Sequence, residues 1–174
     1  MVAKGSNRVY TDLVLHETLS VKMTLASMAN DMFHLLIAYA LAFPIGWDRE
    51  REERSAGIRT FPIVAVGSCG LAMVGTSIAG ASPDSYARIL QGLVTGIGFI
   101  GGGSIMKDRG GVRGTATAAS IFNIGIVGAA VGFGMYHIAA TLSLVNYLTL
   151  KFLLPLKKEA RILDYKSVSN PEDE

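Results

Sequence analysis

The sequence has few charges, a single cysteine and little that suggests a soluble protein. Only 17% of its 174 residues are charged, against about 25% in soluble domains, and half are hydrophobic. Because Cys69 is the only cysteine in the sequence, an internal disulfide and a cysteine-rich zinc site are excluded. A formal net charge of +2 is too small to indicate a nucleic-acid partner. This composition is typical of a membrane protein.

Catalytic patterns are missing as well. The three histidines are far apart, and neither G-x-S-x-G nor H-E-x-x-H occurs. Residues 96–101 match G-x-G-x-x-G, but they lie in an apolar run with no acidic residue about 20 positions later, so no nucleotide site is expected. We therefore expect neither an enzyme nor a resident cofactor. No carboxylate falls mid-membrane, which argues against a proton-coupled pump.

Long uncharged runs predict membrane-spanning helices. Phe61–Ala81 has 21 residues without a charge, Ile89–Met106 has 18 and Gly114–Leu150 has 37. A spanning helix needs about 20 mostly apolar residues, and 37 residues in one helix would be about 55 Å long. The last run should therefore hold two helices, with the break at Gly132–His137.

The sequence thus predicts an all-α, polytopic membrane protein with a glycine-rich bundle of about five transmembrane helices. The first helix contains the run Met32–Trp47 and reaches spanning length if it begins near Met28. The expected spans are 28–47, 61–81, 89–106, 115–135 and 138–156, flanked by an N-terminal extracytoplasmic segment at 1–27 and a cytoplasmic tail at 157–174.

Lysine and arginine are distributed unevenly among the connections. Loop 48–60 carries four, loop 82–88 one, loop 107–114 three, the turn at 135–137 none and the tail after 156 four. Consecutive connections alternate as the positive-inside rule requires. The rule places the two basic loops and the C-terminus in the cytoplasm and the N-terminus outside.

Glycine is abundant in the middle of the chain, where 17 of the 20 glycines fall between residues 61 and 134. Glycines four apart permit close helix packing in membranes, so the third and fourth helices are expected at the bundle centre. The pairs with this spacing are Gly92 and Gly96, Gly98 and Gly102, and Gly128 and Gly132. The run Gly101, Gly102 and Gly103 marks either a close contact with another helix or a break whose freed backbone groups could bind an ion.

A few polar residues are candidates for function. Asn123, near the middle of the fourth helix, either bridges helices or lines a pathway. Asp48 and Glu52 are four residues apart and could together hold Mg²⁺, which needs few protein carboxylates. The alternative is a salt-bridged helix end in water. Asp108 is expected to pair with its basic neighbours Lys107 and Arg109.

Two blocks of the sequence resemble the MgtC/SapB family of bacterial inner-membrane proteins. The first is Gly46-Trp-Asp-Arg-Glu-Arg-Glu-Glu-Arg54 with Ala56-Gly-Ile-Arg-Thr60, similar to the family's G-L-E-R-E … A-G-L-R-T. The second runs from Gly96 to Gly103 and through Val112-Arg-Gly114 and Thr117-Ala-Ala119, similar to S-G-I-G-F-L-G-A-G … V-R-G-L-T-T-A-A. In this resemblance Asp48, Arg49 and Glu50 stand at the acid-basic motif, and Arg59 and Arg113 stand in the inner loops.

The resemblance implies a multi-pass inner-membrane protein linked to growth in low magnesium. It implies modulation of the ATP synthase and of membrane potential rather than magnesium transport. It also implies a short form, since many members carry a folded cytoplasmic domain after the last helix and 18 residues follow Leu156 here.

Two functions stay open. One is a regulatory protein in the lipid bilayer that docks on another membrane complex. The other is a small transporter or channel for magnesium or another ion. A homo-oligomer is compatible with both.

Overall fold

Uncharged runs determine where the helices of this protein lie, and local caps determine where they begin and end. The computed structural model describes residues 3–51, 56–78, 82–108 and 111–168, with side chains for 24–51, 56–78, 82–107 and 111–152. The described residues form an all-α membrane bundle with one short hairpin, so the predicted fold class is confirmed. The elements are α1 (Ala3–Arg51), α2 (Thr60–Ile78), α3 (Pro83–Gly103), β1 (Met106–Asp108), β2 (Gly111–Arg113), α4 (Thr115–Gly132) and α5 (Tyr136–Val168).

α3 begins well before the uncharged run that predicted it. Its N-cap is Ser82, Pro83 is its first residue and Asp84 lies in its first turn, an arrangement that favours a helix start. It ends at Gly103. The helix therefore begins before the expected span 89–106 and ends before residue 106. Charged residues near a helix start bound the uncharged run without ending the helix.

The 37-residue run holds two helices, as predicted. α4 ends at Gly132 and α5 begins at Tyr136. Gly134 lies between them with φ of 74°, a left-handed conformation that glycine adopts without steric cost.

The region 107–114, expected as a loop, contains an antiparallel hairpin. Met106 pairs with Arg113, Lys107 with Val112 and Asp108 with Gly111. Strands of three residues are too short to give a hydrophobic alternation that sequence reasoning can detect.

The two terminal helices are longer than the expected spans. Residues 1–34 form a compact unit of their own, helical from Ala3. Within it, Ser27 Oγ donates a hydrogen bond to the Thr24 carbonyl at 2.9 Å, and His34 Nδ1 lies 2.8 Å from the Asn30 carbonyl oxygen. α5 continues through residue 156, the expected end of the last span, to Val168.

α4 lies at the centre of residues 35–174. It packs against α2, α3 and α5, and ten of its residues are buried. α3 packs against α4 and α2 but buries only Leu93, Ile97 and Gly101. A central position was expected for both helices; it is correct for α4 and wrong for α3.

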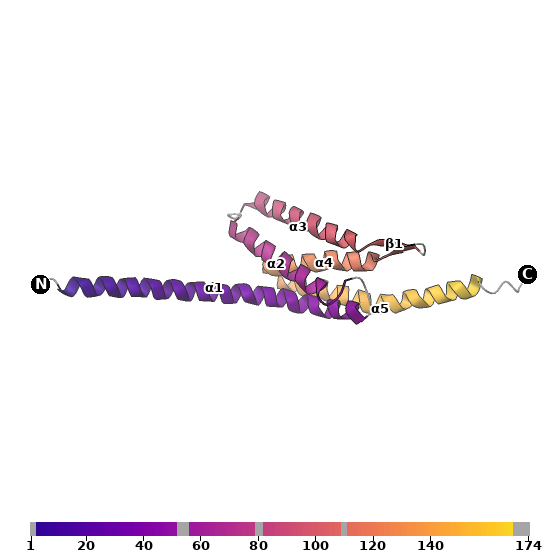
Figure 1. Ribbon diagram of the computed structural model, residues 1–174, viewed down its shortest axis with the longest axis horizontal. Helices are drawn as coiled ribbons and strands as arrows, with labels where there is room; N and C mark the ends of the chain where they lie inside the picture. Colours follow the sequence, from indigo (N-terminus) through magenta and orange to yellow (C-terminus); the bar gives the residue numbers. More distant parts are fainter. Residues whose placement is uncertain (1–2, 52–55, 79–81, 109–110, 169–174) are drawn as a thin grey trace, which may run out of the picture. The chain divides into compact units, whose positions relative to one another are not determined.

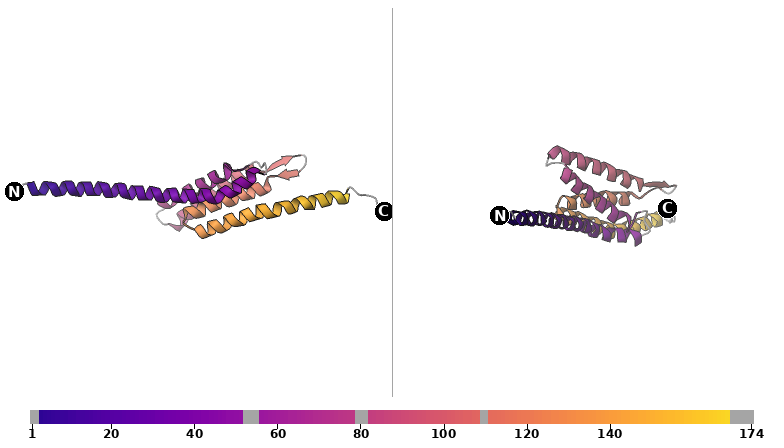
Figure 2. Two further views of the ribbon diagram at one scale, coloured as in Figure 1. Left: turned by 90° about the horizontal axis from the view of Figure 1, so that it is seen from below. Right: turned by 60° about the vertical axis from the view of Figure 1, so that its left-hand side comes forward.

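The helices of this unit run up and down, so the connections gather at two ends (Figure 1). The junction between α1 and α2 and the β1–β2 hairpin lie at one end, called the hairpin end below. The α2–α3 and α4–α5 connections lie at the other end, and the two further views agree (Figure 2).

Three helices are long and apolar enough by themselves to cross a membrane. They are the Thr24–Arg51 part of α1, α2 (Thr60–Ile78) and α4 (Thr115–Gly132). No other helix among the described residues meets both conditions. In α3, Arg88, Gln91 and the glycines lower the mean hydropathy.

Candidate functional site

The last turns of α1 and the start of α2 are joined by one carboxylate. Glu50 Oε2 accepts a hydrogen bond from the backbone N–H of Ile58 at 3.1 Å. The Gly57 carbonyl accepts from the N–H of Phe61 at 3.2 Å, so the Ile58 N–H is one of the free donors at a helix N-terminus. The helix dipole favours a negative acceptor there. Glu50 therefore caps α2 from the neighbouring helix.

Two glycines make this junction sterically possible. A Cβ atom at Gly57 would collide with the Glu50 carboxylate. A Cβ atom at Gly46 would lie 3.1 Å from the Ile58 Cα atom and 3.2 Å from the Gly57 carbonyl oxygen. The glycines and the glutamate of the first sequence block thus form one close contact.

Asp48 and Arg49 lie in the same helical turn with different surroundings. The Arg49 side chain is only 1% exposed, whereas the Asp48 side chain is 25% exposed. Arg49 Nη2 lies 3.9 Å from Asp48 Oδ2. Asp48 Oδ2 is buried and receives no hydrogen bond from any described residue. A guanidinium buried to this degree needs negative charge nearby, and Asp48 provides part of it.

The second sequence block forms the hairpin and the start of α4. Gly114 has φ of 89°, and its carbonyl accepts the first helical hydrogen bond, from the N–H of Ala118 at 2.8 Å. A Cβ atom at Gly114 would collide with the Ser104 carbonyl oxygen. Residue 114 must therefore be glycine on both steric and conformational grounds. Arg113, immediately before it, is exposed.

The three consecutive glycines end α3 rather than break it. Gly101 packs closely, since a Cβ atom there would lie 3.0 Å from the Ala118 carbonyl oxygen, whereas Gly102 and Gly103 have open space among the described residues. The Gly101 carbonyl accepts from Ser104 N at 3.0 Å and from Ser104 Oγ at 2.7 Å. The Gly102 carbonyl accepts from Ile105 N at 3.1 Å. These carbonyls are occupied by the chain's own donors.

Asn123 bridges helices. Its Nδ2 donates to the Leu142 carbonyl at 3.1 Å and so ties α4 to α5. Ser120 Oγ donates to Asn146 Oδ1 at 3.1 Å between the same helices, and Ser143 Oγ donates to the Leu41 carbonyl of α1 at 2.7 Å. We call these three contacts the interhelical polar contacts.

Sequence reasoning found Asn123 but did not identify its companions. A signal was present, because Ser120 and Asn123 are three residues apart on α4, as are Ser143 and Asn146 on α5. Residues with this spacing share one helix face. Two polar faces of equal spacing on consecutive helices indicate that the faces meet.

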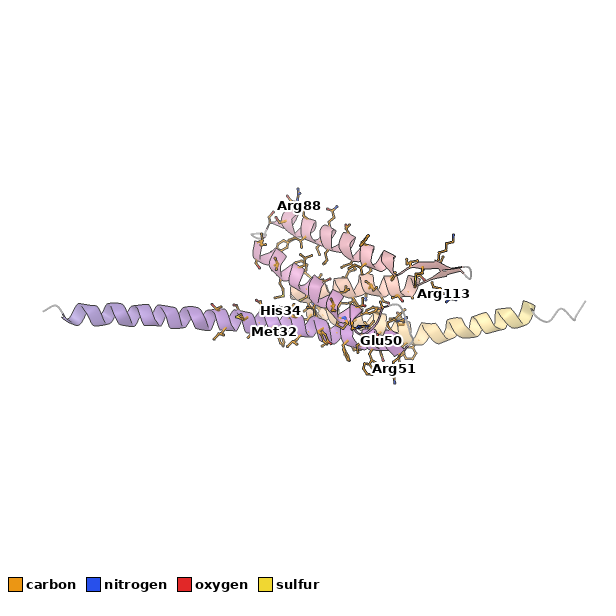
Figure 3. The ribbon with its side chains drawn as sticks, viewed as in Figure 1. Met32, His34, Glu50, Arg51, Arg88 and Arg113 are labelled. Atoms are coloured by element: carbon orange, nitrogen blue, oxygen red, sulfur yellow. The ribbon has the colours of Figure 1, made fainter. Side chains whose placement is uncertain are left out.

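The predicted site residues divide into two groups. Glu50, at the α1–α2 junction, and Arg113, on the hairpin, lie at the hairpin end, whereas Arg88 lies at the other end (Figure 3). Asp48 and Arg49 share the turn of Glu50, and Arg59 is exposed just before α2. Asn123 belongs instead to the bundle interior.

The structure describes only some of the residues that were expected to bind magnesium or to form ion pairs. Glu52, the expected partner of Asp48, and Arg109 lie outside the described residues, as does the side chain of Asp108. In the part of the chain that is described, no three histidine, cysteine or acidic side chains form a group that could hold a metal ion.

Comparison with known proteins covers most of this bundle. Residues 35–159 match the MgtC family. Protein SrpB of Synechococcus elongatus is 31% identical over 160 residues, which span 81% of this chain and 88% of SrpB. Protein MgtC of Salmonella typhimurium is 38% identical over 113 residues (64% of this chain), and Protein MgtC of Brucella abortus is 33% identical over 131 (75% of this chain). No solved structure matches.

The matched part spans 48% of the Salmonella protein and 53% of the Brucella protein. The residues matched by the family, 35–159, nevertheless cover both sequence blocks and the glycine-dependent contacts of the hairpin end. The chain belongs to the MgtC family of membrane proteins.

Proposed function

We propose that this protein is a regulatory membrane protein that adapts membrane energetics to low magnesium by docking on another membrane complex. It lies in the bacterial inner membrane, with its N-terminus outside and the hairpin end in the cytoplasm. The family resemblance points to the ATP synthase as the complex. The proposal assigns no enzymatic activity and no resident cofactor.

The observation that carries this proposal is that polar side chains inside the bundle are hydrogen-bonded to neighbouring helices. The interhelical polar contacts engage Asn123, Ser120 and Ser143 with neighbouring helices. A polar route for an ion would need such groups to face a water-filled path. Groups already engaged between helices stabilise a closed bundle instead.

The continuity of α3 supports the same proposal. Transporters commonly bind ions at helices that are broken near the middle of the membrane. α3 is one helix from Pro83 to Gly103, and the carbonyls of Gly101 and Gly102 accept hydrogen bonds from the residues that follow.

Docking at the hairpin end can be tested with charge-reversal variants in native membranes. Affinity-tagged protein would be extracted in mild detergent from cells grown in low magnesium. We expect ATP synthase subunits to co-purify with the unmodified protein. We expect less of them with Arg59→Glu or Arg113→Glu, because both side chains are exposed at this end.

Arg88→Glu is the matched control, since Arg88 is equally exposed but lies at the other end of the bundle. It should co-purify the synthase as the unmodified protein does. Isolation of the unmodified protein without the synthase, or equal loss with all three variants, would contradict docking at the hairpin end.

The second candidate is a small magnesium transporter or channel. The buried Asp48 Oδ2, which receives no hydrogen bond from any described residue, favours it. A cation path would have to continue from this carboxylate into the bundle, where the interhelical polar contacts join α4 to α5 and α5 to α1. The regulatory proposal is therefore preferred.

A further inference from the structure

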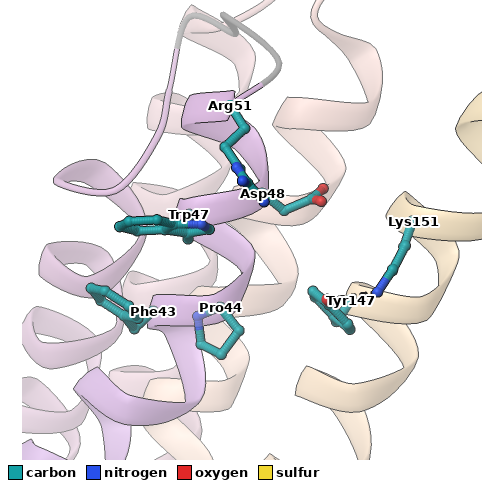
Figure 4. A pocket seen from close by; sticks show the side chains of 7 residues that line it. All are labelled: Phe43, Pro44, Trp47, Asp48, Arg51, Tyr147 and Lys151. Atoms are coloured by element: carbon teal, nitrogen blue, oxygen red, sulfur yellow. Dashed lines mark hydrogen bonds between the residues drawn. The ribbon is translucent and has the colours of Figure 1, made fainter.

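A cavity lies beside Asp48, between the last turns of α1 and the facing side of α5. Its volume is about 410 Å³. Its lining combines aromatic rings, two cations and one carboxylate (Figure 4). The residues that matter here are Phe43, Trp47, Asp48 and Arg51 of α1 and Tyr147 and Lys151 of α5. Neither the proposed docking nor the family assignment uses this cavity.

Each of the two helices contributes one positively charged side chain to the cavity lining, Arg51 from α1 and Lys151 from α5. Lys151 Nζ donates to Tyr147 Oη at 3.2 Å and lies 5.3 Å from the centre of the Tyr147 ring. Among the described residues, no carboxylate lies within ion-pair distance of Lys151 or Arg51. These two cations therefore have capacity for a negatively charged ligand, and a phosphate is the common partner of such a pair.

The carboxylate adds a different requirement. Asp48 extends from α1 toward α5 (Figure 4). Its Oδ2 atom is buried without a hydrogen-bond donor among the described residues, and the Arg49 guanidinium is 3.9 Å away. A buried carboxylate oxygen is costly unless a donor reaches it. The Asp48 side chain is 25% exposed and lines the cavity, so its charge repels a ligand that carries only negative charge and favours one that also carries a cation.

The aromatic residues place the cavity at a membrane boundary. Tyr39, Phe43 and Trp47 stack along one face of α1, with ring centres 6.0 Å and 5.9 Å apart. The Trp47 side chain is 49% exposed, near the end of the apolar stretch Thr24–Arg51. Tryptophan and tyrosine gather where a membrane meets water. The cavity is therefore at the height of lipid headgroups, and an acyl chain can follow the exposed aromatic face of α1.

We propose that this cavity binds the headgroup of a phospholipid that carries both a phosphate and a primary amine, of which phosphatidylethanolamine is the simplest. The phosphate lies between Arg51 and Lys151. The ammonium pairs with the accessible part of the Asp48 side chain, on the side of α1 that faces α5. Phosphatidylglycerol has no cation for Asp48, and the choline group of phosphatidylcholine has no N–H to donate.

Trp47 is the single tryptophan of the chain and lines this cavity, so its fluorescence reports on lipid bound there. The full-length protein would be reconstituted in phosphatidylcholine bilayers. Equal fractions of phosphatidylethanolamine or phosphatidylglycerol with brominated acyl chains would then be introduced. Quenching of Trp47 by each lipid gives its relative binding constant. We expect about a tenfold preference for phosphatidylethanolamine, the effect of one charge-assisted hydrogen bond.

Variants of the two helices test the assignment. Lys151→Met keeps the side-chain length, lies on an exposed position and should lower phosphatidylethanolamine binding. Asp48→Asn should abolish the preference over phosphatidylglycerol. Arg88→Met, at the other end of the bundle, is the matched control and should change neither. Circular dichroism and gel filtration establish that each variant is folded, and Lys151→Met alone tests the proposal if Asp48→Asn does not fold.

Three results would overturn this proposal. They are equal quenching by the two lipids, stronger quenching by phosphatidylglycerol, and unchanged phosphatidylethanolamine binding in the folded Lys151→Met variant. A change in Trp47 emission when soluble phosphoethanolamine is added to the lipid-free protein in detergent would assign the cavity to a free metabolite, which also overturns the lipid assignment.

Discussion

Glycines with the same sequence spacing have different surroundings in this protein. A Cβ atom at Gly128 would collide with the Ala65 carbonyl oxygen, and one at Gly132 would lie 2.5 Å from the Cys69 carbonyl oxygen. A Cβ atom at Gly92 or Gly96 would meet nothing within 4 Å among the described residues. The spacing is the same in both pairs, but only the pair on the central helix touches another backbone.

Gly128→Ala should therefore destabilise the bundle, whereas Gly96→Ala should not. The alanine methyl at 128 meets a backbone carbonyl that cannot turn away, and such overpacking costs about 1–3 kcal/mol. At position 96 the better helix propensity of alanine leaves the free energy of unfolding equal or slightly higher. Thermal unfolding in one detergent compares the two variants, and equal melting temperatures would contradict the packing of α4 on α2.

Glu50 and Gly57 should be energetically coupled. Glu50→Ala removes the cap of α2 and should cost about 0.5–2 kcal/mol. Gly57→Ala should destabilise because its Cβ would collide with the Glu50 carboxylate. The double variant should lose less stability than the sum of the two, because removing the carboxylate removes the collision. Chemical unfolding of all four proteins measures this coupling, and strict additivity would show that the contact does not form.

At the scale of elements, the interhelical polar contacts predict a purely structural effect for Asn123. Asn123→Ala should lower the free energy of unfolding by about 0.6–1.7 kcal/mol, the range for hydrogen bonds between membrane helices. It should leave ion permeability unchanged, because Asn123 Nδ2 is bound to the Leu142 carbonyl. Unfolding in sodium dodecyl sulfate and ion flux through liposomes test the two parts separately. Altered flux with unchanged stability would mean that Asn123 lines a path.

The elements also show how far sequence reasoning reaches. The existence of all five helices could be predicted from the long runs without charged residues, which are directly visible in the sequence. The start of α3 was missed because Ser82 and Pro83 act as local signals within a charged segment. The central position of α3 was wrong because glycine spacing shows that a close contact is possible, not that a neighbour is there. Glu50 was recognised as a motif residue, but its capping of α2 depends on a fold that brings residues 50 and 58 together.

For the whole molecule, the distribution of basic residues predicts one orientation in the membrane. Cys69 is buried and can be replaced by alanine. A single new cysteine at either end of the bundle then shows on which side of the membrane that end lies. Lys107→Cys, on the hairpin, should react with an impermeant maleimide only in inside-out vesicles, whereas Ser82→Cys, before α3, should react only in right-side-out vesicles. Both positions are exposed. The reverse labelling pattern would contradict the positive-inside assignment.

The cavity between α1 and α5 illustrates what sequence reasoning could not reach at this scale. Its lining joins Trp47 and Asp48 to Tyr147 and Lys151, about a hundred positions away. The residue pattern within a single helix does not predict which residues of a distant helix it will contact. The cavity depends on α5 lying beside α1, which the Ser143 hydrogen bond to the Leu41 carbonyl supports.

Magnesium flux into liposomes that hold the purified, folded protein distinguishes a regulatory bundle from a transporter. We expect the same flux as in protein-free liposomes, both for the unmodified chain and for Asp48→Asn. Flux above that level in the unmodified protein, lost in a folded Asp48→Asn variant, would rule out a purely regulatory bundle and identify a transporter with its inner gate at Asp48.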